Sequence, residues 1–518
     1  MSDWTAGYIA DIAYTYGYYT ELNPLRLKLA FLNAGLACPE IANACELGFG
    51  QGMSANLHAA ASITQWHGTD FNPSQAGFAQ ELASISGAGA RLFDEAFADF
   101  AARNDLPEFD YIGLHGIWSW ISDENRRVIV EFIRRKLKVG GVLYISYNTQ
   151  PGWASFAPIR HLMTEHAEII GTEGNGIVSR INGALDFTEK LLATQPMYAR
   201  ANPQIADRIQ KVKEQNRHYL AHEYFNRDWL PMHFASMAEW LKPAKLSYAC
   251  SAHYMDHIDA INLTAEQQQF LAEIPDTQFR ETTRDFMVNQ QFRRDYWVRG
   301  PRTLSPLAQA EQLRQLRVLL IQPRSDVSLK VNGNLGEASL QDSTYTPILD
   351  AMSDHQIISL GKLEQATNLP FAQIFQAIIV LTGAGSVALA QEDTHIAKAK
   401  KSCEKINHYL CQQSRGSSDI SYLASPVSGG GIVVGRFQQL FLLARSQGKK
   451  HPAEMAQFAW QILSTQNQKL VKEGITIESS EDNIAELTQQ AQLFCDKQIG
   501  ILKALGILIM SLAPEHLI

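Results

Sequence analysis

Short apolar runs alternate with helix-forming stretches along the first 150 residues of the chain. Apolar runs of about four to eight residues bounded by turn residues are typical of buried strands, whereas apolar positions three and four residues apart are typical of helices. The runs predict strands at 41–47, 66–70, 91–97, 109–115 and 142–147, and the helical pattern recurs between them, for example at 128–137. This alternation predicts an α/β fold with a doubly wound, mostly parallel sheet, which binds its ligand at the carboxyl ends of its strands.

The pattern changes beyond the fifth strand. Residues 154–215 are predicted to be helical. A strand at 222–225, a helix at 231–241 and a strand at 246–251 then either complete the first sheet or begin a separate domain. On that strand the adjacent His222 and Glu223 would point to opposite faces, which favours a structural role for both.

The second half of the chain is predicted to be mainly helical. Residues 268–299 mix apolar residues with arginines, which favours a solvated helix surface over a contact with an acidic partner. The arginines are Arg284, Arg293, Arg294 and Arg299. Residues 360–389 predict two helices, a turn and a strand, which is the outline of a winged-helix module. The glycine tract at 426–431 predicts a turn or hinge, since no Lys-Ser/Thr follows it.

The composition is that of a globular chain, since 46% of the 518 residues are hydrophobic and 19% are charged. The net charge of −8 argues against a nucleic-acid partner and against binding to an anionic membrane. The six cysteines form no C-x-x-C pair, which indicates reduced thiols and a cytoplasmic protein without a metal site. We expect no signal peptide, and the longest apolar run, 504–513, is about half a membrane span, so we expect a buried helix and no membrane insertion.

A glycine loop follows the first predicted strand, with the spacing Glu46-x-Gly48-x-Gly50-x-Gly52. Glycines at such a point allow a tight turn and a close approach of the backbone to a ligand at the start of the next helix. The loop has neither the spacing of a P-loop nor that of the dinucleotide fingerprint. It is therefore either a nucleoside-binding loop of another kind or a glycine-rich turn that binds nothing.

Two further strand ends predict contacts with a nucleoside. Asp70 closes the second strand, where a carboxylate can accept hydrogen bonds from both ribose hydroxyls, and Phe71 lies beside it. The end of the third strand would face the base, with Ala96 and Phe97 as the expected contacts. The sequence does not distinguish Asp94 from Glu95 as the acid at this end, and ordinary surface acids fit equally well.

Five segments of unusual sequence give the chain a family resemblance. They are AYTYGYYTELNP (13–24), HGIWSWIS (115–122), YISYNTQPGW (144–153), AHEYFNRDWLPMHFASMAEWL (221–241) and QQFRRDYWVRG (290–300). With the E-x-G-x-G-x-G loop, these segments resemble the bacterial class I methyltransferases that carry a methyltransferase regulatory domain. The best-understood members of that family are the rickettsial-type protein lysine methyltransferases.

The resemblance implies a Rossmann-like fold, S-adenosylmethionine (SAM) as the methyl donor and a protein lysine as the acceptor. The residues expected to bind SAM are Tyr18, Tyr19, Glu46, Gly48, Gly50, Gly52, Asp70, Phe71, Ala96 and Phe97. Glu21 and Asn23 either close the N-terminal segment over the cofactor or cap the helix predicted at 25–36. The resemblance divides the chain into a SAM-binding core (1–155), a helical lid or dimerisation insertion (156–215), a regulatory domain (216–300) and a substrate-recognition domain (301–518). A homodimer is compatible with this organisation.

The expected catalytic residues follow from the chemistry of methyl transfer. An in-line displacement depends mainly on positioning, and a lysine amine must arrive neutral in a desolvated site. Aromatic faces tolerate a cationic amine, and the chain places aromatic residues before the core and after the fourth and fifth strands. We expect catalytic roles for His115, Trp118, Tyr147 and Asn148, although the aromatic rings would equally serve as hydrophobic contacts and His115 as a partner of a neighbouring loop. A small-molecule or lipid methyltransferase, or a SAM-binding regulator without catalysis, is the alternative.

Overall fold

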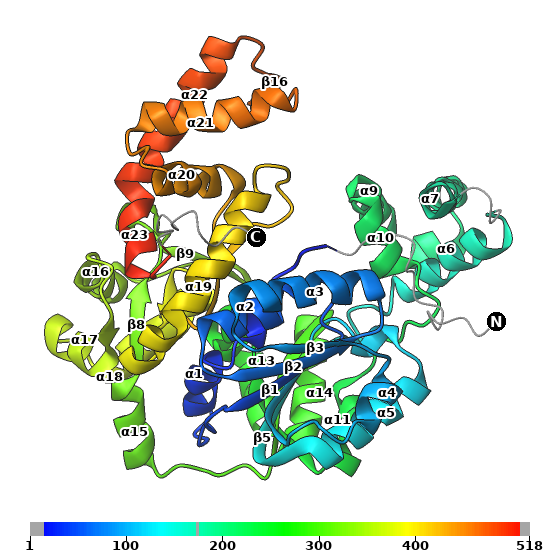
Figure 1. Cartoon of the computed structure of the whole chain (residues 1–518). Coiled ribbons are helices and arrows are strands. Elements are labelled where there is room, and N and C mark those ends of the chain that lie inside the picture. Colours follow the sequence, from blue (N-terminus) through cyan, green and yellow to red (C-terminus); the bar gives the residue numbers. More distant parts are fainter. Residues whose placement is uncertain (1–14, 172–175, 508–518) are drawn as a thin grey trace.

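The computed structural model describes residues 15–171 and 176–507 (Figure 1). Within these ranges, seven strands form one sheet in the order β3-β2-β1-β4-β5-β7-β6, in which β7 runs antiparallel to both of its neighbours. The other neighbouring pairs are parallel. The strands are β1 (Asn43–Leu47), β2 (Gln65–Asp70), β3 (Arg91–Asp94), β4 (Phe109–Leu114), β5 (Leu137–Asn148), β6 (Leu246–Ser251) and β7 (Phe292–Arg299). The predicted α/β sheet is therefore confirmed.

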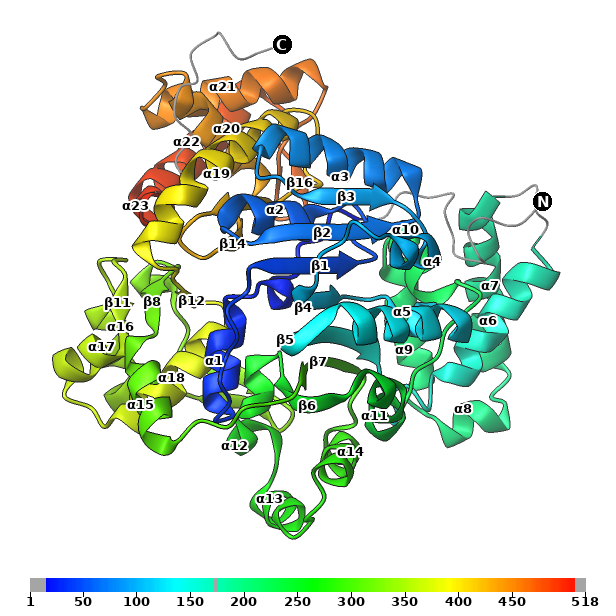
Figure 2. The ribbon, with the colours of Figure 1, turned by 60° about the horizontal axis from the view of Figure 1, so that its bottom comes forward.

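Helices cover both faces of this sheet, because alternate side chains of each strand point to opposite sides. On β4, Tyr111 packs with one core and Ile112 with the other. One face carries α1 (Arg26–Asn33), α2 (Met53–Ala61) and α3 (Pro73–Ser86). The other carries α4 (Phe97–Ala102), α5 (Asp123–Lys136) and α11 (Phe234–Leu241). Figure 2 shows the strands side by side, from β3 at the top to β6 at the bottom.

The alternative left open for residues 216–258 is answered by β6, which pairs with β7 in the same sheet. The predicted strand at 246–251 is confirmed, whereas the one at 222–225 is wrong. That segment ends the helix α10 (Arg217–Tyr224). Between β6 and β7 lie α12 (Asp259–Asn262), α13 (Ala265–Ala272) and α14 (Thr277–Val288).

Three smaller corrections concern the sheet and its arginines. The third strand ends at Asp94, because Phe97 already begins α4. Residues 138–141, between the helical pattern at 128–137 and the strand predicted at 142–147, lie inside β5, where Gly140 adopts a positive φ of 83° and the register with β4 shifts. The arginines of 268–299 are not a solvated helix surface. Arg293 is buried on β7 and Arg294 beside it pairs with Glu21, since a strand turns its side chains alternately to two covered faces.

A helical insertion follows β5, as predicted for 154–215. It consists of α6 (Ala157–Ile169), α7 (Gly176–Ala193), α8 (Met197–Ala201) and α9 (Ile205–Glu214), and it has a small core of its own. Together with α10 it projects from one side of the sheet, beyond the carboxyl ends of the strands (Figure 2).

The first part of the C-terminal region contains the elements predicted for 360–389. These are α17 (Leu360–Thr367), α18 (Phe371–Gly383) and β12 (Val387–Leu389), beside α15 (Pro306–Gln315) and α16 (Asp342–Ala351). β12 joins a small sheet in the order β11-β8-β12, made with β8 (Arg317–Leu320) and β11 (Ile358–Ser359). The hairpin of β9 (Lys330–Gly333) and β10 (Gly336–Ser339) lies within this region.

Of the remaining C-terminal elements, α19 (Asp393–Gln413), β13 (Tyr422–Ser425) and β14 (Gly430–Val433) pack against α2 of the sheet domain, and α19 also packs against α3. The elements that follow are α20 (Arg436–Ser446), α21 (Pro452–Thr465), β15 (Val471–Lys472), β16 (Ile475–Thr476), α22 (Ser480–Leu493) and α23 (Ile499–Ala504). The turn predicted at 426–431 joins β13 to β14. Most of the apolar run 504–513 lies outside the described residues. In the described ranges no single helix meets the length and hydropathy expected of a membrane span, and only the bent pair of α17 and α18 does so together.

Candidate functional site

A cavity of about 190 Å³ opens at the carboxyl ends of β1, β2, β3 and β4. This is the edge of the sheet where a doubly wound fold binds its ligand. Nine of the residues expected to bind the cofactor or to act in catalysis line it: Tyr19, Glu46, Gly48, Gly50, Asp70, Phe71, Ala96, Phe97 and His115. Residues for which no role in a site was predicted complete the wall, among them Gln75, Ile117, Trp120, Asn125, His222, Glu223 and Asp228.

The glycine loop forms one wall of the cavity because its backbone adopts conformations that other residues rarely reach. Gly48 and Gly50 have φ values of 72° and 57°. A Cβ on Gly48 would lie 2.4 Å from the Ile117 side chain. The loop can therefore approach the segment after β4 this closely only because residue 48 is glycine. Gly52 does not line the cavity. It lies where α2 meets α3, with a Cβ position only 2.4 Å from Ala79, so its role is in packing.

Two buried carboxyl groups lie at the floor of the cavity. Burial, and then the nearby charge of Asp70, raises the pKa of Glu46 to about 8. The Oε2 atom of Glu46 is buried and has no hydrogen-bond partner in the described part of the chain. Burial raises the pKa of Asp70 to about 6, although its carboxylate accepts hydrogen bonds from the backbone N–H of Gly50 (2.9 Å) and of Asn72 (3.0 Å). A buried polar atom without a partner is costly, so Glu46 indicates a ligand that supplies one.

The end of β3 decides between the two acids that the sequence left open. Glu95 lines the cavity, whereas Asp94, the last residue of the strand, does not. One carboxylate oxygen of Glu95 accepts a hydrogen bond from Nη1 of Arg103 at 2.6 Å, which fixes the side chain. Ala96 and Phe97 line the same wall, as expected of residues that face a base.

His115 lies opposite the glycine loop and is held on two sides. Its Nδ1 atom is 2.8 Å from the hydroxyl of Tyr144, and its ring stacks on Tyr19 with centroids 3.7 Å apart. Burial lowers the pKa of His115 to about 4, and Glu21 opposes that effect only in part. The imidazole is therefore neutral near pH 7, so it can orient a group by hydrogen bonding but holds a proton poorly.

Helix α10 brings His222 and Glu223 to the cavity, and Asp228 follows from the segment after it. These residues were not predicted for the site because His222 and Glu223 were expected on a strand. The apolar spacing of Leu220, Ala221, Tyr224 and Phe225 fits one face of a helix, and the structure buries all of these side chains. This spacing is the sequence pattern that could have predicted a helix carrying His222 and Glu223.

Tyr18, Trp118, Tyr147 and Asn148 are not brought to the cavity, although all were expected there. The Tyr18 hydroxyl lies 3.0 Å from Nε2 of His58 under the C-terminal hairpin, and Tyr147 donates a hydrogen bond to Asp295 on the neighbouring strand β7. Asn148 is buried at the end of β5, where its backbone N–H donates to Oγ of Ser119. Tyr14, one of the aromatic residues before the core, lies outside the described residues.

Trp118 takes no part in the cavity wall because the short helix after β4 turns its ring inward. The side chain is fully buried and packs edge-to-face with Trp240 at 5.8 Å. Trp120, two residues on, lines the cavity instead. Glu21 and Asn23 do not line the cavity. Glu21 pairs with Arg294, and Oδ1 of Asn23 accepts the backbone N–H of Leu25 just before α1, although no side chain caps the helix itself.

Comparisons with known proteins agree with this architecture. A family model described as a predicted methyltransferase regulatory domain matches residues 216–299. An uncharacterized protein of Synechocystis, sll1526, is 41% identical over 512 residues, which cover 97% of this chain and 99% of that protein. An uncharacterized protein of Rickettsia prowazekii, RP789, is 24% identical over 305 residues, which cover 55% of this chain and 54% of that protein.

A solved structure, PKMT2 from Rickettsia typhi in complex with AdoHcy, is similar to this chain with a TM-score of 0.65. The match covers 93% of this chain and 97% of that one, at 18% sequence identity. At this identity the comparison shows a shared fold over nearly the whole length.

Proposed function

This chain belongs to the family of class I methyltransferases with a methyltransferase regulatory domain, together with the Synechocystis protein sll1526, and on that premise we propose that it methylates a lysine side chain of a protein. The observation that carries the proposal is the cavity at the strand ends, where the glycine loop, Glu46 and Asp70 meet. The structure named PKMT2, solved with AdoHcy, supports the same reading.

The residues of the cavity fit SAM. Glu46 offers a buried carboxyl oxygen without a partner, which suits the positively charged part of the cofactor. Asp70 stands at the end of β2, where its carboxylate suits the ribose hydroxyls, and Ala96 and Phe97 offer an apolar wall to the adenine. When bound, the sulfonium supplies an electrophilic methyl carbon.

Lysine as the acceptor is supported by the opposite wall. Glu223 and Asp228 place two carboxylates at the cavity, which attract an ammonium group from solvent. Tyr19 offers a ring that tolerates a cationic amine, and the neutral His115 can accept a hydrogen bond from the amine and orient it. We therefore assign His115 to positioning the acceptor, and Glu223 and Asp228 to selecting an acceptor with positive charge.

The accessory regions fit a macromolecular acceptor. The insertion at 156–215 carries the chain to α10, which completes the cavity, and the region 301–518 covers α2 and α3. We assign closure of the cavity to the first and substrate choice to the second. A homodimer and a cytoplasmic location stay predictions.

The test uses purified protein, radiolabelled SAM and a proteome extract. Label in the protein fraction that is released as methyl-lysine on hydrolysis supports the proposal. Label confined to the small-molecule fraction would reject the protein acceptor. The absence of any thermal stabilisation by excess SAM would reject the cofactor itself, since a ligand that binds the native state must raise its melting temperature.

A further inference from the structure

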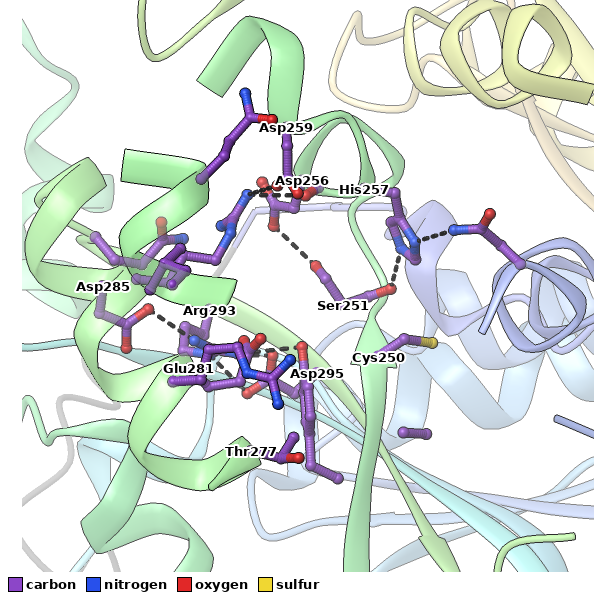
Figure 3. A pocket seen from close by; sticks show the side chains of 18 of the residues that line it. Cys250, Ser251, Asp256, His257, Asp259, Thr277, Glu281, Asp285, Arg293 and Asp295 are labelled. Carbon is purple, nitrogen blue, oxygen red and sulfur yellow. Dashed lines mark hydrogen bonds and ion pairs between the residues drawn. The ribbon is translucent and has the colours of Figure 1, made fainter. Parts of the chain in front are cut away.

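A second cavity, of about 500 Å³, lies between the edge strand β6 and the helices α13 and α14. Apart from Asn33, every described residue that lines it falls within 248–295, inside the segment that matches the regulatory-domain model. It shares no lining residue with the cavity at the strand ends. Figure 3 shows its side chains converging from β6, β7 and α14.

The floor of this cavity is a buried cluster around Arg293. Its guanidinium pairs with Asp295 at 2.9 Å, with Asp285 at 2.7 Å and with Glu281 at 2.8 Å. The exposed fractions of the Arg293, Asp285 and Asp295 side chains are 6%, 2% and 1%. One guanidinium thus faces three carboxylates among the described residues, so the floor carries an excess of buried negative charge.

Asp285 shows the consequence of that excess. Burial raises the pKa of this carboxyl group to about 7. The positive charge of Arg293 lowers the pKa, and the negative charge of Asp295 raises it. One of its oxygens pairs with Arg293, and the other, Oδ2, is buried without a hydrogen-bond partner in the described ranges. An unpaired buried carboxylate oxygen beside surplus negative charge favours a cationic group in the cavity.

Arg280 adds the opposite charge on the same helix. Thr277, Arg280, Glu281 and Arg284 follow the spacing of one face of α14, and all of them line the cavity. Arg284 donates a hydrogen bond to the backbone oxygen of Asp256 and lies 3.6 Å from the carboxylate of Asp259. The Arg280 side chain makes no hydrogen bond or ion pair within the described ranges, and its Nε atom is buried without a partner. A guanidinium group without a partner can form charge-assisted hydrogen bonds with the carboxylate of a ligand.

The other reactive groups of the wall are already engaged or inert. His257 has both ring nitrogens in use, Nδ1 with Asn33 at 2.9 Å and Nε2 with the backbone oxygen of Ser251 at 2.8 Å. Burial raises the pKa of the Cys250 thiol, so the nucleophilic thiolate is suppressed. The cavity is therefore built to bind and not to react.

We propose that this second cavity binds a small zwitterion of the amino-acid class, with its ammonium group on the carboxylates around Arg293 and its carboxylate on Arg280. A volume of about 500 Å³ suits a ligand of this size. The rim at Ala272 and Thr277 is exposed, so such a ligand can enter from solvent, while the floor is buried.

The test compares three probes with the same carbon skeleton on the full-length protein: γ-aminobutyrate, butylamine and butyrate. We expect γ-aminobutyrate to bind, butylamine to bind about tenfold more weakly for want of one charged hydrogen bond, and butyrate to show no measurable affinity. Calorimetry or ligand-observed NMR gives the dissociation constants. Failure of both amines to bind, or tighter binding of butyrate than of butylamine, would overturn the proposal.

Two variants locate the binding. Glu281→Gln keeps the hydrogen bond to Arg293 but removes a charge. It should therefore raise the dissociation constants of both amines by about tenfold or more. Arg280→Gln should lower the affinity for γ-aminobutyrate to that for butylamine and leave the affinity for butylamine unchanged. Glu273→Gln, on an exposed residue outside the cavity wall, is the matched control and should change nothing. The site would be rejected if Glu273→Gln lost as much affinity as the cavity variants, or if neither cavity variant lost affinity. Both cavity residues are partly exposed, which keeps the fold intact.

Discussion

The two cavities of this protein are built in different ways. At the strand ends, the polar groups are backbone amides and acids that follow strands, and the parallel sheet itself sets their positions. Beside β6, the floor is set by ion pairs between a strand and a helix, with Arg293 at the centre. In the first cavity a lost charge should therefore affect mainly the ligand. In the second, loss of the central guanidinium of Arg293 should affect the fold.

The largest effect that this comparison predicts is on stability. Arg293→Ala would leave three carboxylates without their guanidinium, two of them almost fully buried, and should lower the free energy of unfolding by about 3–5 kcal/mol. Urea denaturation measures it. Arg302→Ala, on an exposed arginine, should change stability by less than about 0.5 kcal/mol. Similar losses in the two variants would contradict the structural role of the cluster.

The second effect is on cofactor binding. Asp70→Ala should weaken SAM binding by about 1.5–3 kcal/mol, the usual contribution of a hydrogen bond to a charged group. Asp94→Ala is the matched control, because Asp94 pairs with Asp70 in register across β2 and β3 but lies outside the cavity wall. Calorimetric titration compares the two. If both variants bind SAM equally well, Asp70 has no part in the site.

The third effect is a dependence of SAM affinity on pH. A cationic ligand beside Glu46 lowers the pKa of that carboxyl group, so the complex holds fewer protons than the free protein and affinity rises with pH up to about 8. Asp70, with a pKa of about 6, acts in the same direction at lower pH. We expect a gain of about tenfold between pH 6 and pH 8, the equivalent of one pKa unit. Glu46→Gln should flatten this rise, and a rise that survives the substitution would assign it to another group.

The smallest effect concerns the acceptor. Glu223→Gln should raise the KM for a lysine-bearing substrate by about threefold at low salt, with little change in kcat, because a charge at the rim acts mainly on encounter. The difference should shrink at high salt as the charges are screened. Glu214→Gln, on the exposed end of α9, serves as the control. A large fall in kcat would give Glu223 a role in the chemical step instead.

Much of the sheet could be predicted because its strands are local patterns. The apolar runs and the Glu46–Gly52 spacing specify strand, loop and helix without reference to distant residues. The segment at 222–225 was mistaken because two aromatic residues in a four-residue window favour a strand, whereas its helix packs against α7 of the insertion. Tertiary contacts decide such short segments.

The candidate site was predictable where it depends on strand ends and not where it depends on side-chain direction. Glu46, Asp70 and Ala96 follow from the position of each strand. Trp118 and Tyr147 occur in segments of the right kind, but the Trp118 ring turns inward to Trp240 and the Tyr147 hydroxyl bonds to Asp295 on the neighbouring strand. The cluster around Arg293 brings together α14 and β7, and no local pattern reports that pairing.

Helix α2 directly follows the glycine loop, and all of its residues, Met53–Ala61, are buried. Part of that burial comes from the hairpin β13–β14, where a Cβ on Gly431 would lie 3.0 Å from the Leu57 side chain. The cover of α2 is thus translated about 370 residues after the helix itself. At about 5–20 residues per second, the ribosome leaves the apolar face of α2 without its final partner for roughly 20–70 s. The segment that follows the glycine loop is therefore among the first parts of the chain to be made and among the last to be finished.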